Sequence, residues 1–149
     1  MSKYDELRDG YLASKAADVE HWEALQHALR EFRKDFSAHL GIPEGARIRV
    51  GSTEIPPVVL GSEVDNFFKL VPYNSLKKFN YGYEFAMRVS FDEEVYESPC
   101  NFAVIPLHIS KPEGEIVIKH FAGFDTKSFQ GPDFSGLYEY LIETLKANY

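Results

Sequence analysis

One amphipathic stripe constrains the fold of this chain more than any other feature. Between residues 19 and 40, apolar side chains recur at steps of three and four, which is the spacing of one helix face. Gly41 suits the left-handed position that follows a helix, and Pro43 forbids continuation. The stripe comprises Val19, Trp22, Leu25, Leu29, Phe32, Phe36 and Leu40. The pattern predicts a long N-terminal helix that buries one face against another layer.

Two starting points are open for this helix. Asp18 can cap a helix that begins at residue 19 by accepting a backbone N–H. Upstream, the same rhythm continues at Tyr4, Leu7 and Tyr11. The helix can therefore also begin near Ser2, although Gly10 costs that extension about 1 kcal/mol relative to alanine.

The middle of the chain is typical of strands. Residues 46–50 and 55–60 flank a short polar link, and Pro56 and Pro57 would confine the second strand to a sheet edge. Residues 66–71 fit either a short strand or a helical turn. Residues 83–91 alternate apolar and polar side chains, so we expect a strand with one buried and one wetter face.

A hairpin is predicted for residues 101–109 and 115–121, joined by a turn over 111–114. Its first strand is apolar on both faces, which indicates a central strand covered on both sides. Helices on one side cannot cover both faces, so the second face needs a loop, another helix or another subunit.

A last helix is expected over residues 134–147, with a stripe from Phe134 to Leu145 and Asp133 as its cap. The order is then a long N-terminal helix, an antiparallel sheet of four to six strands in hairpins, and a C-terminal helix. We therefore predict one α+β domain over residues 1–149.

Charge and composition exclude several function classes. The chain has 149 residues, 16 Lys and Arg, 23 Asp and Glu, and a net charge of −7, with no basic cluster for a phosphate backbone. No nucleic acid and no membrane are therefore expected as partners, and no phosphate-binding motif calls for a cofactor. The single cysteine, Cys100, and the lack of an apolar leader fit a cytoplasmic protein.

Two histidines suggest a small-ligand pocket. If residue 111 pairs with 115, then His108 faces Ile118 and His120 faces Pro106. The histidines would then be diagonal neighbours about 7–8 Å apart on one face. A zinc site needs a third protein ligand that this hairpin does not supply, so we expect no metal.

Aromatic residues make up 15% of the chain, and tyrosine is favoured at protein interfaces. One loop is dense in them and carries a neighbouring lysine: Tyr73, Lys77, Phe79, Tyr81 and Tyr83. A second loop is acidic: Asp92, Glu93, Glu94 and Glu97. Such a loop can dock a basic partner.

The favoured hypothesis is a small acidic, non-catalytic interaction module of the accessory, inhibitor or immunity type, which binds a protein partner through these two loops. The alternative is a ligand-binding domain or minor enzyme whose aromatic pocket carries His108 and His120. Homodimerisation through the doubly apolar strand or the first helix is compatible with both.

Overall fold

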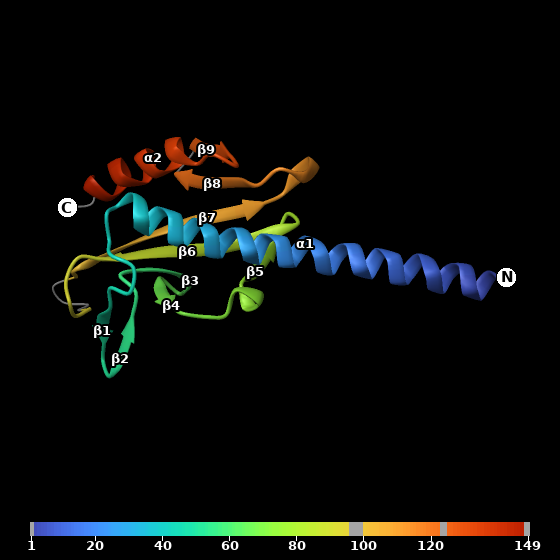
Figure 1. The fold of residues 1–149 in the computed structure, drawn as a ribbon, viewed down its shortest axis with the longest axis horizontal. Coiled ribbons are helices and arrows are strands. Elements are labelled where there is room, and N and C mark those ends of the chain that lie inside the picture. Colours follow the sequence, from blue (N-terminus) through green and yellow to red (C-terminus); the bar gives the residue numbers. More distant parts are fainter. Residues whose placement is uncertain (1, 96–99, 123–124, 148–149) are drawn as a thin grey trace.

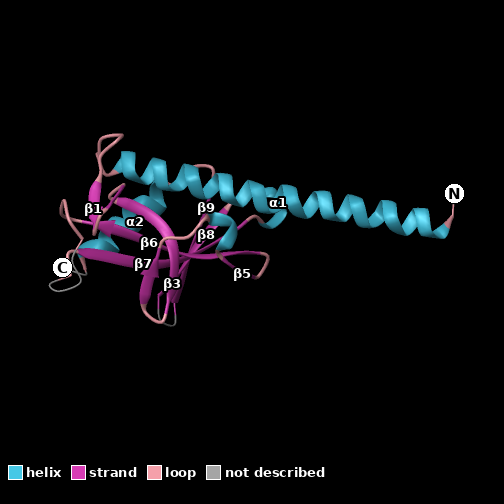
Figure 2. Cartoon of the chain, turned by 90° about the horizontal axis from the view of Figure 1, so that it is seen from below, coloured by secondary structure: helices cyan, strands magenta, loops and turns pink. Residues whose placement is uncertain are grey.

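A computed structural model describes residues 2–95, 100–122 and 125–147. Its first element, α1 (Lys3–His39), crosses one face of an antiparallel sheet and extends far beyond it toward the N-terminus, as Figure 1 and Figure 2 show. The last element, α2 (Ser135–Lys146), packs on the same face of the sheet beside the C-terminal half of α1.

The longer of the two possible first helices is the one that forms. The Ser2 hydroxyl accepts from the backbone N–H of Asp5 at 3.1 Å, and the Asp5 carboxylate accepts from the backbone N–H of Ser2 at 3.4 Å. This reciprocal capping box supplies partners for two backbone donors at the start of α1. Asp18 lies inside the helix, so its expected role as the cap is wrong.

The described residues form nine strands and two short 3-10 helices. They are β1 (Ile48–Val50), β2 (Thr53–Ile55), β3 (Val58–Val64), β4 (Phe67–Lys69), η1 (Tyr73–Ser75), β5 (Lys77–Phe79), β6 (Gly82–Ser90), β7 (Phe102–Ser110), η2 (Pro112–Gly114), β8 (Val117–Ala122) and β9 (Asp125–Gln130). β1 and β2 pair with each other, and the rest form one sheet in the order β4-β3-β6-β7-β8-β9, with β5 also on β6.

The α+β class and the order of helix, antiparallel strands and helix are confirmed. The main sheet has seven strands rather than four to six, because three-residue strands such as β4 and β5 are too short to show a period. The strand expected at an edge over residues 55–60 begins at Val58 as β3, and both prolines precede it. Val58–Gly61 pairs with β6 and with no second strand among the described residues, as expected for an edge, whereas Ser62–Val64 pairs with β4.

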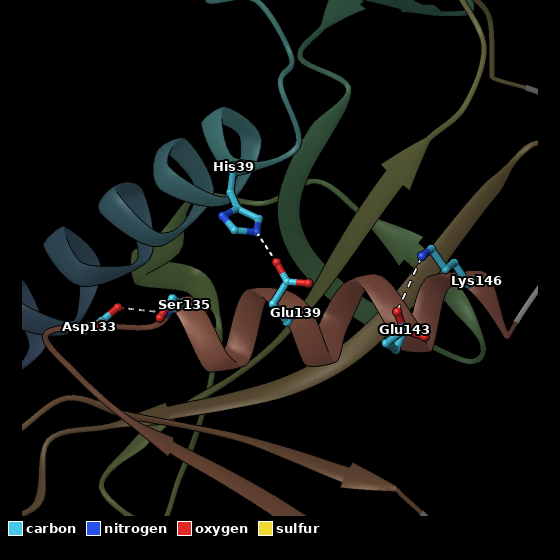
Figure 3. A network of polar contacts seen from close by, with 6 residues as sticks. All are labelled: His39, Asp133, Ser135, Glu139, Glu143 and Lys146. Carbon is cyan, nitrogen blue, oxygen red and sulfur yellow. Dashed lines mark hydrogen bonds and ion pairs between the residues drawn. The ribbon is translucent and has the colours of Figure 1, made fainter.

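The core lies between the two helices and one face of the sheet. Its buried side chains are Leu25, Leu29, Phe32 and Phe36 of α1, Leu137, Leu141 and Leu145 of α2, Tyr83, Phe85, Met87 and Val89 of β6, and Ile105, Leu107 and Ile109 of β7. A hydrogen bond also joins the two helices, since His39 Nε2 of α1 lies 2.9 Å from Glu139 Oε1 of α2 (Figure 3).

The opposite face of β6 is also buried, so the expected wetter face is wrong. Ala86, Arg88 and Ser90 are 1%, 8% and 8% exposed. The hairpin of β3 and β4 folds back over this face, and a Cβ at Gly61 would collide with the Lys69 carbonyl and the Phe68 ring. β7 is central as predicted, but its second face is only partly covered, because Pro106 is exposed.

The division of α1 into a packed and an open half predicts two different mutational effects. Leu29→Ala removes a side chain that is 0% exposed and should cost about 3 kcal/mol of unfolding free energy. Leu12→Ala makes the same chemical change where the side chain is 47% exposed and should cost about 0.5 kcal/mol or less. Urea denaturation of both variants measures the difference; equal losses would contradict this packing.

Candidate functional site

The N-terminal half of α1 is the most exposed apolar feature among the described residues. Every side chain from residue 2 to residue 20 is exposed. Tyr4, Leu7 and Tyr11 are 70%, 74% and 63% exposed, yet they continue the stripe that the sheet buries completely at Leu25 and Leu29. We call Tyr4, Leu7 and Tyr11 the open stripe. These three side chains have the same spacing along the helix as the residues that pack against the sheet farther along α1.

Basic side chains lie beside the open stripe, whereas most acidic side chains of the same segment lie on the opposite side of the helix. At 3.6 residues per turn, Lys3, Arg8 and Lys15 lie within about 75° of its centre. The acidic side chains beyond about 125° on the helical wheel are Asp5, Glu6, Asp9 and Glu20. Asp18 is the one acidic group near the stripe between residues 3 and 20, and its carboxylate accepts a hydrogen bond from the Tyr81 hydroxyl at 2.8 Å. The stripe therefore has basic borders.

Tyr81 connects this helix to the sheet. Its ring stacks on His21 with centroids 3.8 Å apart, and its carbonyl accepts from His21 Nε2 at 2.9 Å. The hydrogen bond to the Asp18 carboxylate raises the pKa of the Tyr81 hydroxyl above its usual value. The side chain is still 56% exposed. Tyr81 thus lies where the exposed N-terminal half of α1 meets the domain.

The other residues of the aromatic loop divide between core and surface. Tyr83 is 1% exposed and accepts from Gln26 Nε2 at 3.1 Å, so its expected place in a docking surface is wrong. Tyr73 is half-buried against the core, and this burial raises its pKa. Phe79 is 45% exposed, and the exposed Lys77 lies 3.6 Å from Glu84. From the aromatic loop, Phe79 and Tyr81 are the aromatic side chains that stay largely exposed.

The acidic loop lies at the other end of β6 from Tyr81. The nine residues of β6 separate the two loops by about 30 Å. Asp92 and Glu93 are exposed, while Glu94 lies 3.6 Å from Arg49. Glu97 lies outside the described residues. The two loops therefore do not form one compact surface.

His108 and His120 do not share a face. His108 pairs with Lys119 and Ile109 pairs with Ile118, one residue away from the expected register. A slip of one residue turns a side chain to the other face of a strand. His108 Nε2 donates to the carbonyl of Phe79 at 2.7 Å, whereas a hydrogen bond of 2.6 Å joins His120 Nδ1 to the Tyr140 hydroxyl. A pocket that carries both histidines is excluded.

The turn between the two strands accounts for the register. Glu113 and Gly114 both have positive φ, 54° and 84°. Ser110 pairs with Val117, so six residues, 111–116, lie between the paired positions. Composition alone suggested a tighter turn, because glycine but not glutamate favours positive φ.

Known proteins add no functional information. Comparisons with family models, with curated proteins and with solved structures found no match. Across residues 2–95, 100–122 and 125–147, no three His, Cys, Asp or Glu side chains come together as a metal site. In that same part of the chain, no helix has both the length and the apolar character needed to cross a membrane.

Sequence reasoning missed two features. It assigned no environment to the apolar side chains before residue 19, although a helix of 37 residues is about 55 Å long and strands of nine residues are about 30 Å long. That mismatch was the available signal for the open stripe. It also placed Arg88 on a wetter strand face, and no sequence signal indicated its burial.

The buried His120 predicts a specific acid sensitivity. Burial lowers the pKa of His120 below its usual value, so the folded state favours the neutral ring. This contribution to stability is present above the unfolded pKa of about 6.5 and is lost as the pH falls through the folded pKa. His120→Gln should flatten the loss of stability below about pH 6.5. His27→Gln, at an exposed position, is the control for a histidine-to-glutamine change outside the buried site.

Urea unfolding at a series of pH values measures these slopes. The groups beside His120 are the Tyr140 hydroxyl and Lys127 on the paired strand. If the His120 and His27 variants give the same slope as the unsubstituted chain, the burial of His120 does not govern the acid sensitivity.

Proposed function

We propose that this protein is a non-catalytic interaction module whose open stripe docks an amphipathic helix of a protein partner. The observation that carries this proposal is the continuation of the core stripe of α1 onto exposed helix. Residues 3–20 extend for about 27 Å with every side chain exposed. Tyr81 and Phe79 extend the surface onto the domain.

Helix physics supports a partner for this segment. An isolated helix of this length is marginal in water, because most helical stability in proteins comes from packing of an amphipathic face. The capping box at Ser2 and continuity with the packed half sustain the segment. Two of its apolar side chains are tyrosines, which are enriched among the residues that dominate binding energy at interfaces.

Charge argues for a different chain as the partner, rather than a second copy. In a self-pair of either direction, Arg8 would lie beside a basic residue of the copy, Lys15 when antiparallel and Lys3 when parallel. Like charges at such positions destabilise pairing. A helix with an apolar stripe and acidic borders would place opposite charges there. The proposed occupant is such a helix.

The acidic loop of Asp92–Glu94 is not part of this surface, since it lies at the far end of β6. An accessory, inhibitor or immunity-type role fits a module that binds through one projecting helix. This assignment of role is an analogy based on size and charge.

Variants on two sides of α1 test the docking surface. Leu7→Glu with Tyr11→Glu should lower capture of the partner from the native host at least tenfold, because each places a charge inside the apolar contact. Leu12→Glu introduces the same charge at a side chain that is 47% exposed and about 107° from the stripe centre, and should leave capture unchanged. Quantitative mass spectrometry of the captured proteins measures both. Equal capture by all variants would remove the open stripe from the proposal.

The charge argument also predicts the oligomeric state. The isolated protein should sediment as a monomer at micromolar concentration, because self-pairing brings basic borders together. Analytical ultracentrifugation measures this directly. A dimer that Leu7→Glu dissociates would show that a second copy, not an acidic helix, occupies the stripe.

A further inference from the structure

Arg88 is a buried cation on the face of β6 away from the helices. It is 8% exposed, and no carboxylate of the described residues lies within ion-pair distance of it. Its Nε is buried with no hydrogen-bond partner in that part of the chain. The guanidinium instead lies near two aromatic rings, 4.5 Å from the Phe68 centroid and 5.6 Å from the Phe102 centroid.

This arrangement is costly for the fold alone. Burial lowers the pKa of Arg88, which reports that the cation has lost hydration. Attraction to the two rings recovers part of that loss, but an apolar side chain of similar length could fill the same space without it. Packing therefore does not explain why an arginine occupies this position of β6.

A cavity adjoins this cation on the sheet face away from the helices. Its volume is about 670 Å³, and Arg88 lines it together with apolar side chains that include Val50, Phe67, Val95, Phe102 and Val104. Cavities that bind small ligands commonly fall between about 300 and 1,000 Å³ and combine apolar walls with few polar groups. Glu63 is the one acidic side chain among the lining residues.

We propose that this cavity binds a small monocarboxylate with an apolar body, and that Arg88 holds the carboxylate. A planar guanidinium matches a carboxylate in shape and charge, and the Phe68 and Phe102 rings pack near it. The apolar walls suit a hydrocarbon body. One cation offers less to a phosphate, which carries more charge, than to a single carboxylate.

This site is separate from the docking surface. Arg88 pairs with Val59 and Val104 in the sheet, whereas the open stripe lies on the projecting half of α1. Binding of a carboxylate therefore does not depend on the protein partner, and either proposal can fail alone.

An NMR titration with sodium octanoate, in which the amide chemical shifts of the protein are monitored, tests the site. Octanoate should shift resonances around Arg88, Phe68 and Phe102 in a saturable way. Octanamide, which has the same body without the charge, should bind at least tenfold more weakly, and so should inorganic phosphate. Arg88→Met should abolish octanoate binding, whereas Lys69→Met, which removes an exposed cation from the neighbouring β4, should not change it.

Arg88→Met should also remain folded and melt at a temperature about 3 °C higher or more, because it removes a buried charge that no carboxylate of the described residues neutralises. Octanoate should raise the melting temperature of the unsubstituted chain but not that of this variant. If Arg88→Met does not fold, Arg88→Lys keeps the charge without the planar fork and should bind octanoate more weakly. Equal affinity for octanoate and octanamide, or no saturable shift at millimolar octanoate, would overturn the proposal.

Discussion

Burial of one stripe of α1 against β6 and β7 sets the rest of this structure. Leu25, Leu29 and Phe36 are fully buried there. The ring centroids of Phe32 and Phe85 lie 6.1 Å apart, in an edge-to-face contact. Because this contact uses one face of the sheet, α2 packs beside α1 on that face, where its Tyr138 lies against Phe36. The other face is covered only in part, by the short hairpin of β3 and β4 and by the β1–β2 pair, whose Ile48 and Ile55 cluster with Val59. The cavity at Arg88 is the result of that partial cover.

The same stripe is buried at one end and exposed at the other because the helix of 37 residues is longer than the nine-residue strands that it packs on. Packing ends near Trp22, where Lys78 lies 4.5 Å from the indole centroid and Tyr81 closes the junction. Beyond that point the apolar spacing continues without the sheet. A buried face and an exposed apolar face therefore follow from one periodic pattern, and only the presence of a covering layer distinguishes them.

Periodicity and turn residues predicted much of the fold. The end of α1 at Gly41, the central position of β7 and the C-terminal helix follow from apolar spacing and from residues with special backbone preferences. Features that depend on contacts across the fold were not predictable: the β7–β8 register depends on Glu113 at positive φ, and burial of Arg88 depends on Phe68 from β4. The candidate site was predicted only in part, because the sequence does not show which tyrosines of a loop face the core. Tyr81 was identified from composition, whereas Tyr83 from the same loop is core.

Hydrogen–deuterium exchange of the isolated protein, resolved along α1, tests the central claim most directly. Amides in the packed half of the helix should open only with the global unfolding of the domain, since the sheet covers them. Amides of residues 3–18 should exchange faster by orders of magnitude, because local fraying exposes them without disturbing the core. Uniform strong protection from residue 3 to residue 39 would contradict the account. It would mean that the open stripe is already covered when the protein is alone.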